Sequence, residues 1–208
     1  MVNLFSGAML AGGQSRRMGQ DKSRMEIHIP GQGRTTSGDA VLTVLDMVCE
    51  DVMIVGGESL YPDRHSHYPD TFHGGGVLSG IHSALTYASY EYVFITGCDM
   101  PFLDVNTISA MFALACGFDV TVPIVDGRAE TLHAVYRVSC IEPIRHALNS
   151  GKRRVVEFFP AVHVREIPEN EFKTINPSGH SNRNINSPRD VEQAIADRLL
   201  QGNEGSRS

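Results

Sequence analysis

Glycines and cationic side chains gather in one short stretch near the start of the chain. Residues 9–23 read MLAGGQSRRMGQDKS, in which Gly12 and Gly13 precede Arg16, Arg17 and Lys22. Glycine lets the backbone approach a ligand closely, arginine can bind a phosphate through two parallel hydrogen bonds, and lysine acts as a compact point charge. The stretch therefore predicts a cradle for an anion, in particular a polyphosphate. The alternative is a basic surface turn without a ligand.

Two well-known phosphate loops do not match this stretch. A Walker loop has four residues between its first glycine and its Gly-Lys pair. Here five residues separate Gly13 from Gly19, and Gln20 and Asp21 intervene before Lys22. The dinucleotide fingerprint GxGxxG is also missing. The predicted cradle therefore represents another class of nucleotide site.

The chain as a whole is acidic, so this basic stretch is a local exception. Its 208 residues are 41% hydrophobic and 20% charged, with a formal net charge of −6. That composition predicts a packed globular core, and the negative charge argues against nucleic acid or a membrane surface as the main partner. We expect one domain over residues 1–200, followed by a polar tail over residues 201–208 that frays.

The cysteines indicate a reducing compartment. They are widely spaced and form no CxxC pair: Cys49, Cys98, Cys116 and Cys140. Small buried thiols are therefore expected rather than a zinc site or a disulfide framework. The apolar run over residues 2–10 lacks a basic leader and is too short to cross a bilayer. The sequence predicts a cytoplasmic protein.

Short apolar runs alternate with helical patterns along the chain. The runs predict strands over 4–10, 52–55, 92–96 and 120–125, and the patterns predict helices over 40–48, 82–88 and 107–116. This alternation is typical of a single three-layer α/β/α nucleotide-binding domain, doubly wound and Rossmann-like, with a mostly parallel central sheet. Further along we expect strands over 130–137 and 161–167, and helices over 141–149, around 154–159 and from Pro188 onward.

An aspartate follows the strand predicted over 92–96. Asp99 lies in the sequence GCDMP, so it should reach the same sheet edge as the glycine stretch. A carboxylate there can hold a Mg²⁺ ion that bridges phosphate oxygens. The alternative is a helix N-cap for residues 105–111, a position for which Asp104 is better placed.

Histidines gather in the segment HSHYPDTFH, at His65, His67 and His73. Their spacing fits no standard set of zinc ligands, so a solvated loop is expected. His133 alternates with apolar neighbours in TLHAVY, which predicts a strand residue in the wall of the site or in the core.

The stretch LAGGQSRRMGQDK, residues 10–22, resembles the signature of nucleotidyltransferases of the molybdenum cofactor guanylyltransferase type, L-A-G-G-x-S-x-R-M-G-x-D-K. The resemblance implies that this loop holds the triphosphate of GTP through Leu10, Ala11, Gly12, Gly13 and Lys22. It further implies that Arg17 and Lys22 stabilise the charge that develops during the reaction. Asp99 is then the Mg²⁺ ligand.

Two further motifs match the family around the nucleotide base. GGVLSG, residues 75–80, is similar to the family's G-P-L-A-G, which helps enclose the guanine and includes Gly80. Val77 replaces the usual proline, and Ser79 the usual alanine. Asp70 matches a family aspartate associated with GTP binding, although an Asx turn after Pro69 would also explain it.

Motifs in the last third of the chain imply contacts with the metal or with the second substrate. NINSPRD resembles the family's N-x-N-T-P-E-D, so Asn184 and Asn186 should lie near the metal or a phosphate, with capping of the final helix as the alternative. GKRRV resembles G-E-R-R-V, whose arginines, here Arg153 and Arg154, would receive the phosphate of molybdopterin; exposed helix arginines are the alternative.

The match is weaker elsewhere in the chain. ETL, residues 130–132, stands where the family often has Q-P-L, so Thr131 replaces a proline. Residues 29–39 match poorly where a G-K-P-L motif is expected.

The resemblance implies a specific reaction, the transfer of GMP from Mg·GTP to the terminal phosphate of molybdopterin or its molybdenum-loaded form, with release of pyrophosphate. Proteins that insert or deliver the molybdenum cofactor are then possible partners. Alternatives are CTP as the donor to molybdopterin, another nucleotide on a sugar phosphate, and a nucleotide-binding module without turnover. The paired glycines of LAGG favour guanylyl transfer because related cytidylyl and sugar enzymes more often have L-A-A-G. The presence of Lys22 and Asp99 argues against a mere binding module.

Overall fold

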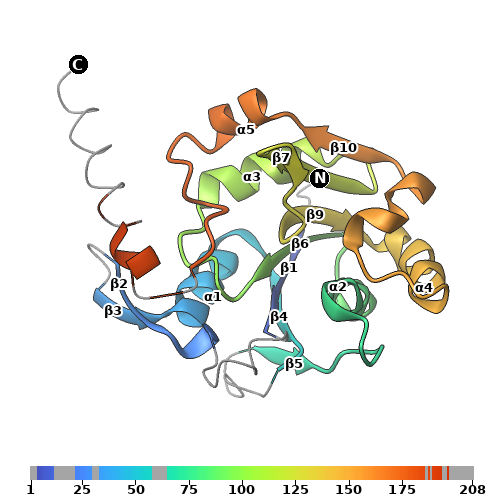
Figure 1. The fold of residues 1–208 in the computed structure, drawn as a ribbon, viewed down its shortest axis with the longest axis horizontal. Helices are drawn as coiled ribbons and strands as arrows, with labels where there is room; N and C mark the ends of the chain where they lie inside the picture. The colour runs from blue at the N-terminus through green and yellow to red at the C-terminus, as the bar shows by residue number, and fades with distance from the viewer. Residues whose placement is uncertain are drawn as a thin grey trace.

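A sheet of mostly parallel strands runs through the centre of the molecule (Figure 1). The computed structural model describes residues 4–11, 22–29, 33–57, 65–185, 187, 189–193 and 196. The sheet has the order β10-β7-β9-β6-β1-β4-β5, with β8 paired to β7. Its strands are β1 (Ser6–Leu10), β4 (Asp51–Val55), β5 (Ser66–Tyr68), β6 (Tyr92–Gly97), β7 (Val120–Val125), β8 (Arg128–Ala129), β9 (His133–Arg137) and β10 (Val164–Ile167). Pairing in the main order is parallel except at β9, which runs antiparallel to both β6 and β7.

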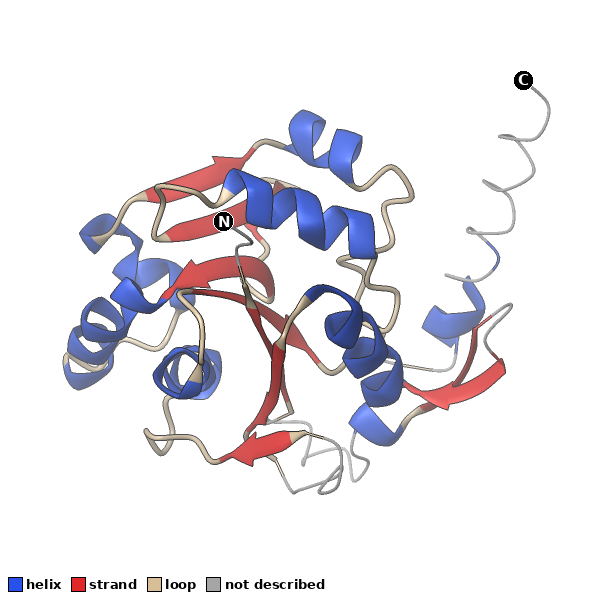
Figure 2. Ribbon diagram, turned by 180° about the vertical axis from the view of Figure 1, so that it is seen from behind, coloured by secondary structure: helices blue, strands red, loops and turns tan. Residues whose placement is uncertain are grey.

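Helices cover both faces of this sheet (Figure 2). On one face lie α2 (Gly76–Tyr87) and α4 (Ile141–Asn149), and on the other lie α1 (Ser37–Val48), α3 (Val105–Leu114) and α5 (Glu169–Ile175). The side chains of a strand alternate between the two cores, so that Ala8 and Leu10 pack on the α2 side and Met9 on the α1 side. The prediction of a three-layer α/β fold with a mostly parallel sheet is confirmed.

The strand order of the sheet reverses beside β1, whose parallel neighbours β4 and β6 lie on opposite sides of it. The crossover through α1 leads from β1 to β4 on one side, and α2 leads to β6 on the other side of β1. Ligands of such sheets bind outside the carboxyl ends of the strands at this switch point. Backbone hydrogen bonds connect the ends of the three strands there. The amide of Cys98 donates to the carbonyl of Leu10 at 3.2 Å, and the amide of Ala11 donates to the carbonyl of Val55 at 2.9 Å.

Several elements differ from their predicted bounds. Helix α2 begins at Gly76, not at residue 82, and Gly75 just before it is closely packed, since a Cβ there would lie 2.6 Å from that of Ser79. The segment predicted as a helix around 154–159 is the 3₁₀ helix η4 (Val155–Ala161), which contains Pro160. Strand β9 starts only at His133, because residues 130–132 form a turn.

The sequence analysis missed a small antiparallel hairpin formed by β2 (Glu26–Ile29) and β3 (Gly33–Thr36). It lies apart from the main sheet and is held by its own apolar cluster, in which Ile27 and Ile29 pack with Phe102, Ile185 and Val191. The hairpin gave little signal because β2 has only two inward apolar residues and β3, GRTT, has none. Two short 3₁₀ turns, η2 (Lys22–Arg24) and η3 (Val138–Cys140), and helix α5 were also not predicted.

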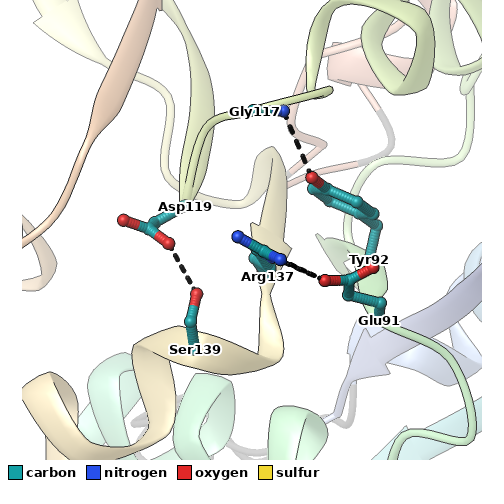
Figure 3. Close-up of polar contacts among 6 residues, drawn as sticks. All are labelled: Glu91, Tyr92, Gly117, Asp119, Arg137 and Ser139. Atoms are coloured by element: carbon teal, nitrogen blue, oxygen red, sulfur yellow. Dashed lines mark hydrogen bonds and ion pairs between the residues drawn. The ribbon is translucent and has the colours of Figure 1, made fainter.

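A network of polar side chains connects neighbouring strand ends at the sheet edge opposite the switch point (Figure 3). The carboxylate of Asp119, just before β7, accepts hydrogen bonds from the hydroxyl of Ser139 at 2.6 Å and from the amide of His163 at 2.9 Å. Arg137, at the end of β9, forms an ion pair with Glu91. The network therefore joins the ends of β6, β7, β9 and β10.

The burial of the cysteines and the structure near the end of the chain agree only in part with the sequence predictions. Cys49 and Cys140 are buried and Cys98 is half-buried, but Cys116 is exposed just after α3, so the prediction of buried thiols is wrong for Cys116. Residues 189–193 are helical, whereas Pro188 and the tail over 201–208 lie outside the described residues. Separately, none of the helices that the structure describes is both long enough and apolar enough to cross a membrane.

Candidate functional site

The predicted nucleotide loop leaves the sheet at the centre of the switch point. Leu10 ends β1 and is buried, and Ala11 follows it half-buried. Gly57, after β4, approaches so closely that a Cβ on it would lie 2.8 Å from the carbonyl oxygen of Ala11. The backbone of Lys22 begins η2. Gly12, Gly13, Arg16, Arg17 and the side chain of Lys22 lie outside the described part of the structure, so their roles stay predictions.

Asp70 and Gly80 come together with Leu10 beside the start of this loop. A Cβ on Gly80 would lie 3.0 Å from Leu10 Cδ1 and 3.7 Å from Asp70 Oδ1. Gly80 lies within α2, so its backbone N–H is used by the helix. Gly80 therefore has no free backbone N–H to offer to a ligand. Its missing side chain instead lets α2 pack against Leu10.

The surroundings of Asp70 favour a role other than a local turn. Phe72, whose amide would close an Asx turn on Asp70, instead donates to the hydroxyl of Ser79 at 3.2 Å. Burial raises the pKa of Asp70 above its ordinary value, and the charge of nearby His73 opposes that rise. The result is a half-buried carboxylate next to the end of β1.

Asp99 lies where β6 ends. Its Oδ1 is only 2.7 Å from the point where a Cβ on Gly97 would stand, so the carboxylate lies over a glycine that leaves room for it. The backbone oxygen of Asp99 accepts a hydrogen bond from the amide of Ile185 at 2.7 Å. The N-cap of α3 is Asp104, whose carboxylate accepts from the amide of Thr107 at 2.8 Å. Capping of α3 therefore does not account for Asp99.

A second carboxylate near Asp99 escaped the sequence analysis. Glu130 is half-buried just before β9. Burial raises the pKa of Glu130, the Leu132 amide opposes the rise, and the negative charge of Asp99 adds to it. The available signal was the departure ETL, in which an ionisable residue replaces the glutamine of the family pattern. Thr131, in place of the proline, keeps its carbonyl bonded to the hydroxyl of Tyr136 at 2.8 Å.

The segment that leads to Asn184 is fixed against the sheet. The hydroxyl of Ser181 accepts from the amide of Asp104 at 3.1 Å and lies 3.3 Å from Nε2 of His133. His133 is fully buried in the core, and burial lowers its pKa to about 3, so the imidazole stays neutral. Asn184 is exposed beside the Ile185–Asp99 hydrogen bond, whereas Asn186 lies outside the described residues.

The two predicted acceptor arginines lie in the loop after α4. Arg153 and Arg154 are exposed, and Arg153 Nη1 donates to the carbonyl of Leu148 at 3.0 Å. Glu157 accepts hydrogen bonds from both arginine amides, which fixes the loop backbone. Leu148 also approaches the N-terminal end of α2, since its Cδ2 would lie 3.0 Å from a Cβ on Gly75. The arginine loop therefore borders the glycine-rich segment that follows Asp70.

The histidine segment is only partly solvated: His73 is exposed, as expected, whereas the expectation is wrong for His65 and His67, which are half-buried. Nε2 of His67 lies 2.8 Å from the carbonyl oxygen of Gly56, and the side chain of His65 is only 7% exposed beside Asp46. The residues that the structure describes contain no group of three or more His, Cys, Asp or Glu side chains able to hold a metal. Any metal here must therefore be completed by substrate oxygens or by residues outside that set.

Comparison with known proteins points to one family. Residues 7–165 match the family model of the MobA-like NTP transferase domain. The chain is 36% identical to a probable molybdenum cofactor guanylyltransferase from Pelotomaculum thermopropionicum, over 91% of each chain. It is 34% identical to a molybdenum cofactor guanylyltransferase from Desulfosudis oleivorans, over 94% of this chain and 96% of the other.

A solved structure has the same fold. Molybdopterin-guanine dinucleotide biosynthesis protein A from Archaeoglobus fulgidus superimposes with a TM-score of 0.75, over 95% of this chain and 99% of the other. The two sequences are 22% identical. The two proteins therefore share the same arrangement of sheet and helices.

Proposed function

Because the chain belongs to the family of MobA-like NTP transferases and is a nucleotidyltransferase of molybdenum cofactor biosynthesis, we propose that it transfers GMP from GTP. The acceptor is the terminal phosphate of molybdopterin or its molybdenum-loaded form, and pyrophosphate is the second product. The names of its relatives support guanine as the base and the molybdenum cofactor as the acceptor.

One observation carries the proposal: two chemistry-bearing positions far apart in sequence meet at the switch point. The signature loop leaves the carboxyl end of β1 after Leu10, and Asp99 follows the neighbouring strand β6, whose Gly97 pairs with Leu10. This is the edge where such sheets bind nucleotides. This arrangement supports a site in which the loop after Leu10 and the carboxylate of Asp99 bind the same triphosphate.

The chemistry needs charge neutralisation more than proton transfer. The attacking phosphate is already ionised at neutral pH, so no strong general base is required. Catalysis then rests on holding the acceptor phosphate in line with the α-phosphorus and on neutralising the departing pyrophosphate. We assign this neutralisation to Lys22 and Arg17, and the binding of phosphate oxygens to the amides of Gly12 and Gly13.

Asp99 offers a donor that suits Mg²⁺. Its carboxylate lies over Gly97 in a space that a Cβ would fill, and it brings a hard anionic oxygen to the strand edge. Mg²⁺ is usually held through one or two carboxylates together with substrate phosphates. Asp99 would therefore hold the ion, which when bound neutralises charge on the phosphoryl oxygens. Asn184 adjoins this position through Ile185, and we assign it and Asn186 to the same neighbourhood.

In this proposal the guanine base and the molybdopterin acceptor bind on opposite sides of the site. The half-buried Asp70, packed with Leu10 and Gly80, serves the guanine side, since a carboxylate can accept hydrogen bonds from the N–H groups on the guanine edge. Arg153 and Arg154 serve the phosphate of molybdopterin. Guanidinium groups that are exposed on a loop with a fixed backbone can receive such a group bidentately.

Pyrophosphate release from GTP, CTP and ATP with molybdopterin as acceptor tests the function. We expect kcat/KM to be highest for GTP. A preference for CTP would make the protein a cytidylyltransferase, and turnover with sugar phosphates but not with molybdopterin would replace the acceptor. Nucleotide binding without pyrophosphate release under any of these conditions would reduce it to a binding module.

A further inference from the structure

The segment that carries Asp70 lies along the N-terminal part of α2. Gly80 of that helix faces both Leu10 and Asp70, because a Cβ on it would lie 3.0 Å from Leu10 Cδ1 and 3.7 Å from Asp70 Oδ1. The Asp70 carboxylate therefore lies beside the residue with which β1 ends. Within the part of the chain that the structure describes, no hydrogen bond holds this carboxylate itself. Its position therefore depends on the backbone around it.

Hydroxyl groups fix the two residues that follow Asp70 against α2. The hydroxyl of Ser83 accepts from the amide of Thr71 at 2.9 Å and lies 3.1 Å from Thr71 Oγ1. The hydroxyl of Ser79 accepts from the amide of Phe72 at 3.2 Å and donates to the carbonyl of Phe72 at 2.7 Å. We call Thr71, Ser79 and Ser83 the hydroxyl clamp, because together they bind both amides and one carbonyl of this segment.

The hydroxyl clamp is buried on its helix side and its bonds support one another. Ser79 and Ser83 are fully buried, and the hydroxyl of Ser83 also donates to the carbonyl of Ser79 at 3.0 Å. Thr71 Oγ1 lies 2.9 Å from Nδ1 of the buried His82, whose ring packs edge-on against Phe72 with the ring centroids 5.0 Å apart. A buried polar network whose bonds are satisfied in this way is rigid, so it gives the segment a single position.

Packing of α2 does not by itself require the hydroxyl of Ser79. The atom of Ser79 that lies against Gly75 is its Cβ, which alanine, the usual residue of the family motif, would also supply. What alanine would lack is the pair of hydrogen bonds to Phe72. A side chain that recognises a ligand by hydrogen bonds binds it more tightly when it is already held in place, because ordering it on binding costs free energy. The extra hydroxyl therefore suits the positioning of Asp70.

We propose that the hydroxyl clamp positions Asp70 for recognition of the nucleotide base, so that Ser79 and Ser83 are positioning residues that determine base specificity. This inference rests on the proposed function, which places guanine beside Asp70. A carboxylate can accept hydrogen bonds from the ring N–H and the exocyclic amino group of guanine together, a paired contact that depends on the place and angle of both oxygens. A displaced Asp70 would lose this pair, while the signature loop would still bind the triphosphate.

The test is a calorimetric titration of the full-length protein with GTP and with inosine triphosphate (ITP), which lacks the exocyclic amino group. No acceptor is present, so no GMP is transferred. We expect wild type to bind GTP more tightly than ITP by roughly 10–100-fold, the usual effect of one hydrogen bond to a charged group. Asp70→Asn should remove most of this preference. The double variant Ser79→Ala/Ser83→Ala should lower the preference by about tenfold, mainly through weaker GTP binding.

A double-mutant cycle distinguishes positioning of Asp70 from a general loosening of the site. Adding Ser79→Ala/Ser83→Ala to Asp70→Asn should not lower the preference for GTP over ITP any further, because the hydroxyl clamp acts through Asp70. Loss of stability alone would weaken both nucleotides equally and leave their ratio unchanged.

Single substitutions supply the matched controls. Thr71→Val, which removes the hydroxyl at nearly constant volume, should lower the preference, and Thr71→Ser, which keeps the hydroxyl, should retain it. Ser109→Ala removes an exposed helix hydroxyl of α3 that donates to the carbonyl of Val105 at 2.8 Å, and it should leave the preference at its wild-type value. Ser79→Ala alone is the mildest variant of the hydroxyl clamp, and it should lower the preference without unfolding the protein.

The outcomes separate the two proposals. A preference that is present in wild type, lost in Asp70→Asn and retained in Ser79→Ala/Ser83→Ala overturns the positioning role and leaves the proposed function standing. An equal loss with and without the Asp70 carboxylate also overturns that role, because the serines would then act on another part of the site. Wild-type protein that binds GTP and ITP equally overturns both the base contact of Asp70 and its positioning, while pyrophosphate release from GTP tests the transfer reaction separately.

Discussion

At the residue scale, Asp99 tests the metal site most directly. Asp99→Asn is nearly isosteric, so packing over Gly97 should be retained while the charge that attracts Mg²⁺ is lost. We expect turnover to fall by roughly 10²–10³-fold, the usual effect of losing one preorganised electrostatic group. GTP affinity should fall less than turnover does. Turnover measured against Mg²⁺ concentration, with thermal melting as the folding control, decides this; wild-type turnover at the same Mg²⁺ would move the metal elsewhere.

The corresponding test of triphosphate binding is a substitution of Lys22. It is the lysine that closes the signature stretch, and its side chain is expected to bind phosphate oxygens as a point charge. Lys22→Ala should weaken GTP binding and slow turnover while the melting temperature stays nearly unchanged. Calorimetric titration of GTP measures the first effect. A variant with both wild-type affinity and wild-type turnover would remove Lys22 from the phosphate site.

Gly80 tests whether close packing sets the position of the nucleotide loop. In Gly80→Ala the new methyl group would meet Leu10 Cδ1 at 3.0 Å, so Leu10 must shift slightly. Alanine within a helix is more favourable than glycine by about 0.5–1 kcal/mol, which offsets the strain in folding stability. We expect little change in melting temperature but a raised KM for GTP, because Leu10 begins the loop. An unchanged KM would mean that the loop does not depend on this contact.

At the element scale, the strength of each local pattern decides what could be predicted. Strands β1 and β6 and helix α4 gave clear apolar patterns, and α4 was predicted with its observed bounds, Ile141–Asn149. The hairpin β2–β3 escaped because Ile27 and Ile29 are buried only by residues that come more than a hundred positions later, such as Ile185. The start of α2 escaped because three consecutive glycines usually signal a loop, and only the contact with Leu148 shows that Gly75 is closely packed.

The polar network at the far end of the sheet gives an element-scale prediction. The hydroxyl of Ser139 and, more weakly, the amide of His163 hold the pKa of Asp119 below its ordinary value of 3.8. A depressed pKa in the folded state means that the charged carboxylate stabilises the fold above that ordinary value, and that this stability is lost as the pH falls through the lower, folded pKa. Asp119→Asn should therefore destabilise the protein by about 1 kcal/mol at neutral pH, after discounting for partial exposure.

Melting curves at several pH values measure this effect. A loss of about 1 kcal/mol corresponds to a melting temperature lower by roughly 2–4 °C in a chain of this size. The difference between wild type and Asp119→Asn should shrink as the pH falls below 3.8, the ordinary pKa of the carboxyl. A difference that stays constant down to the lowest pH would assign the loss to packing rather than to charge. Catalysis should be unaffected at neutral pH, since Asp119 lies at the opposite edge from Asp99.

At the scale of the whole molecule, the topology read from the sequence predicted which sheet edge carries the candidate site, but not which residues surround it. An apolar strand followed by glycines, and a second strand followed by Asp99, were enough to place both at one edge of a parallel sheet. Glu130 could not be placed in this way, because it lies just before β9, which in the described structure runs antiparallel to its neighbours β6 and β7. The burial of His133 likewise depends on Phe94 and Phe172, which come from different elements.

The last prediction concerns the way the end of the chain supports the site. The side chain of Ile185 is fully buried between the β2–β3 hairpin and Phe102, and its amide donates to the carbonyl of Asp99 at 2.7 Å. Ile185→Ala should destabilise the fold by roughly 2–5 kcal/mol through the cavity it leaves. It should also raise the Mg²⁺ concentration needed for half-maximal turnover, because the segment that bonds to Asp99 loses its anchor.

Ile167 supplies the matched control for that prediction. It is equally buried, but it lies in the edge strand β10, far along the sheet from β6. Ile167→Ala should lower the melting temperature by a similar amount because it also empties a fully packed position. Assayed well below both melting temperatures, it should leave the Mg²⁺ dependence unchanged. If both variants shift the Mg²⁺ dependence equally, the effect follows global stability, and the hydrogen bond between Ile185 and Asp99 has no special part in holding the carboxylate.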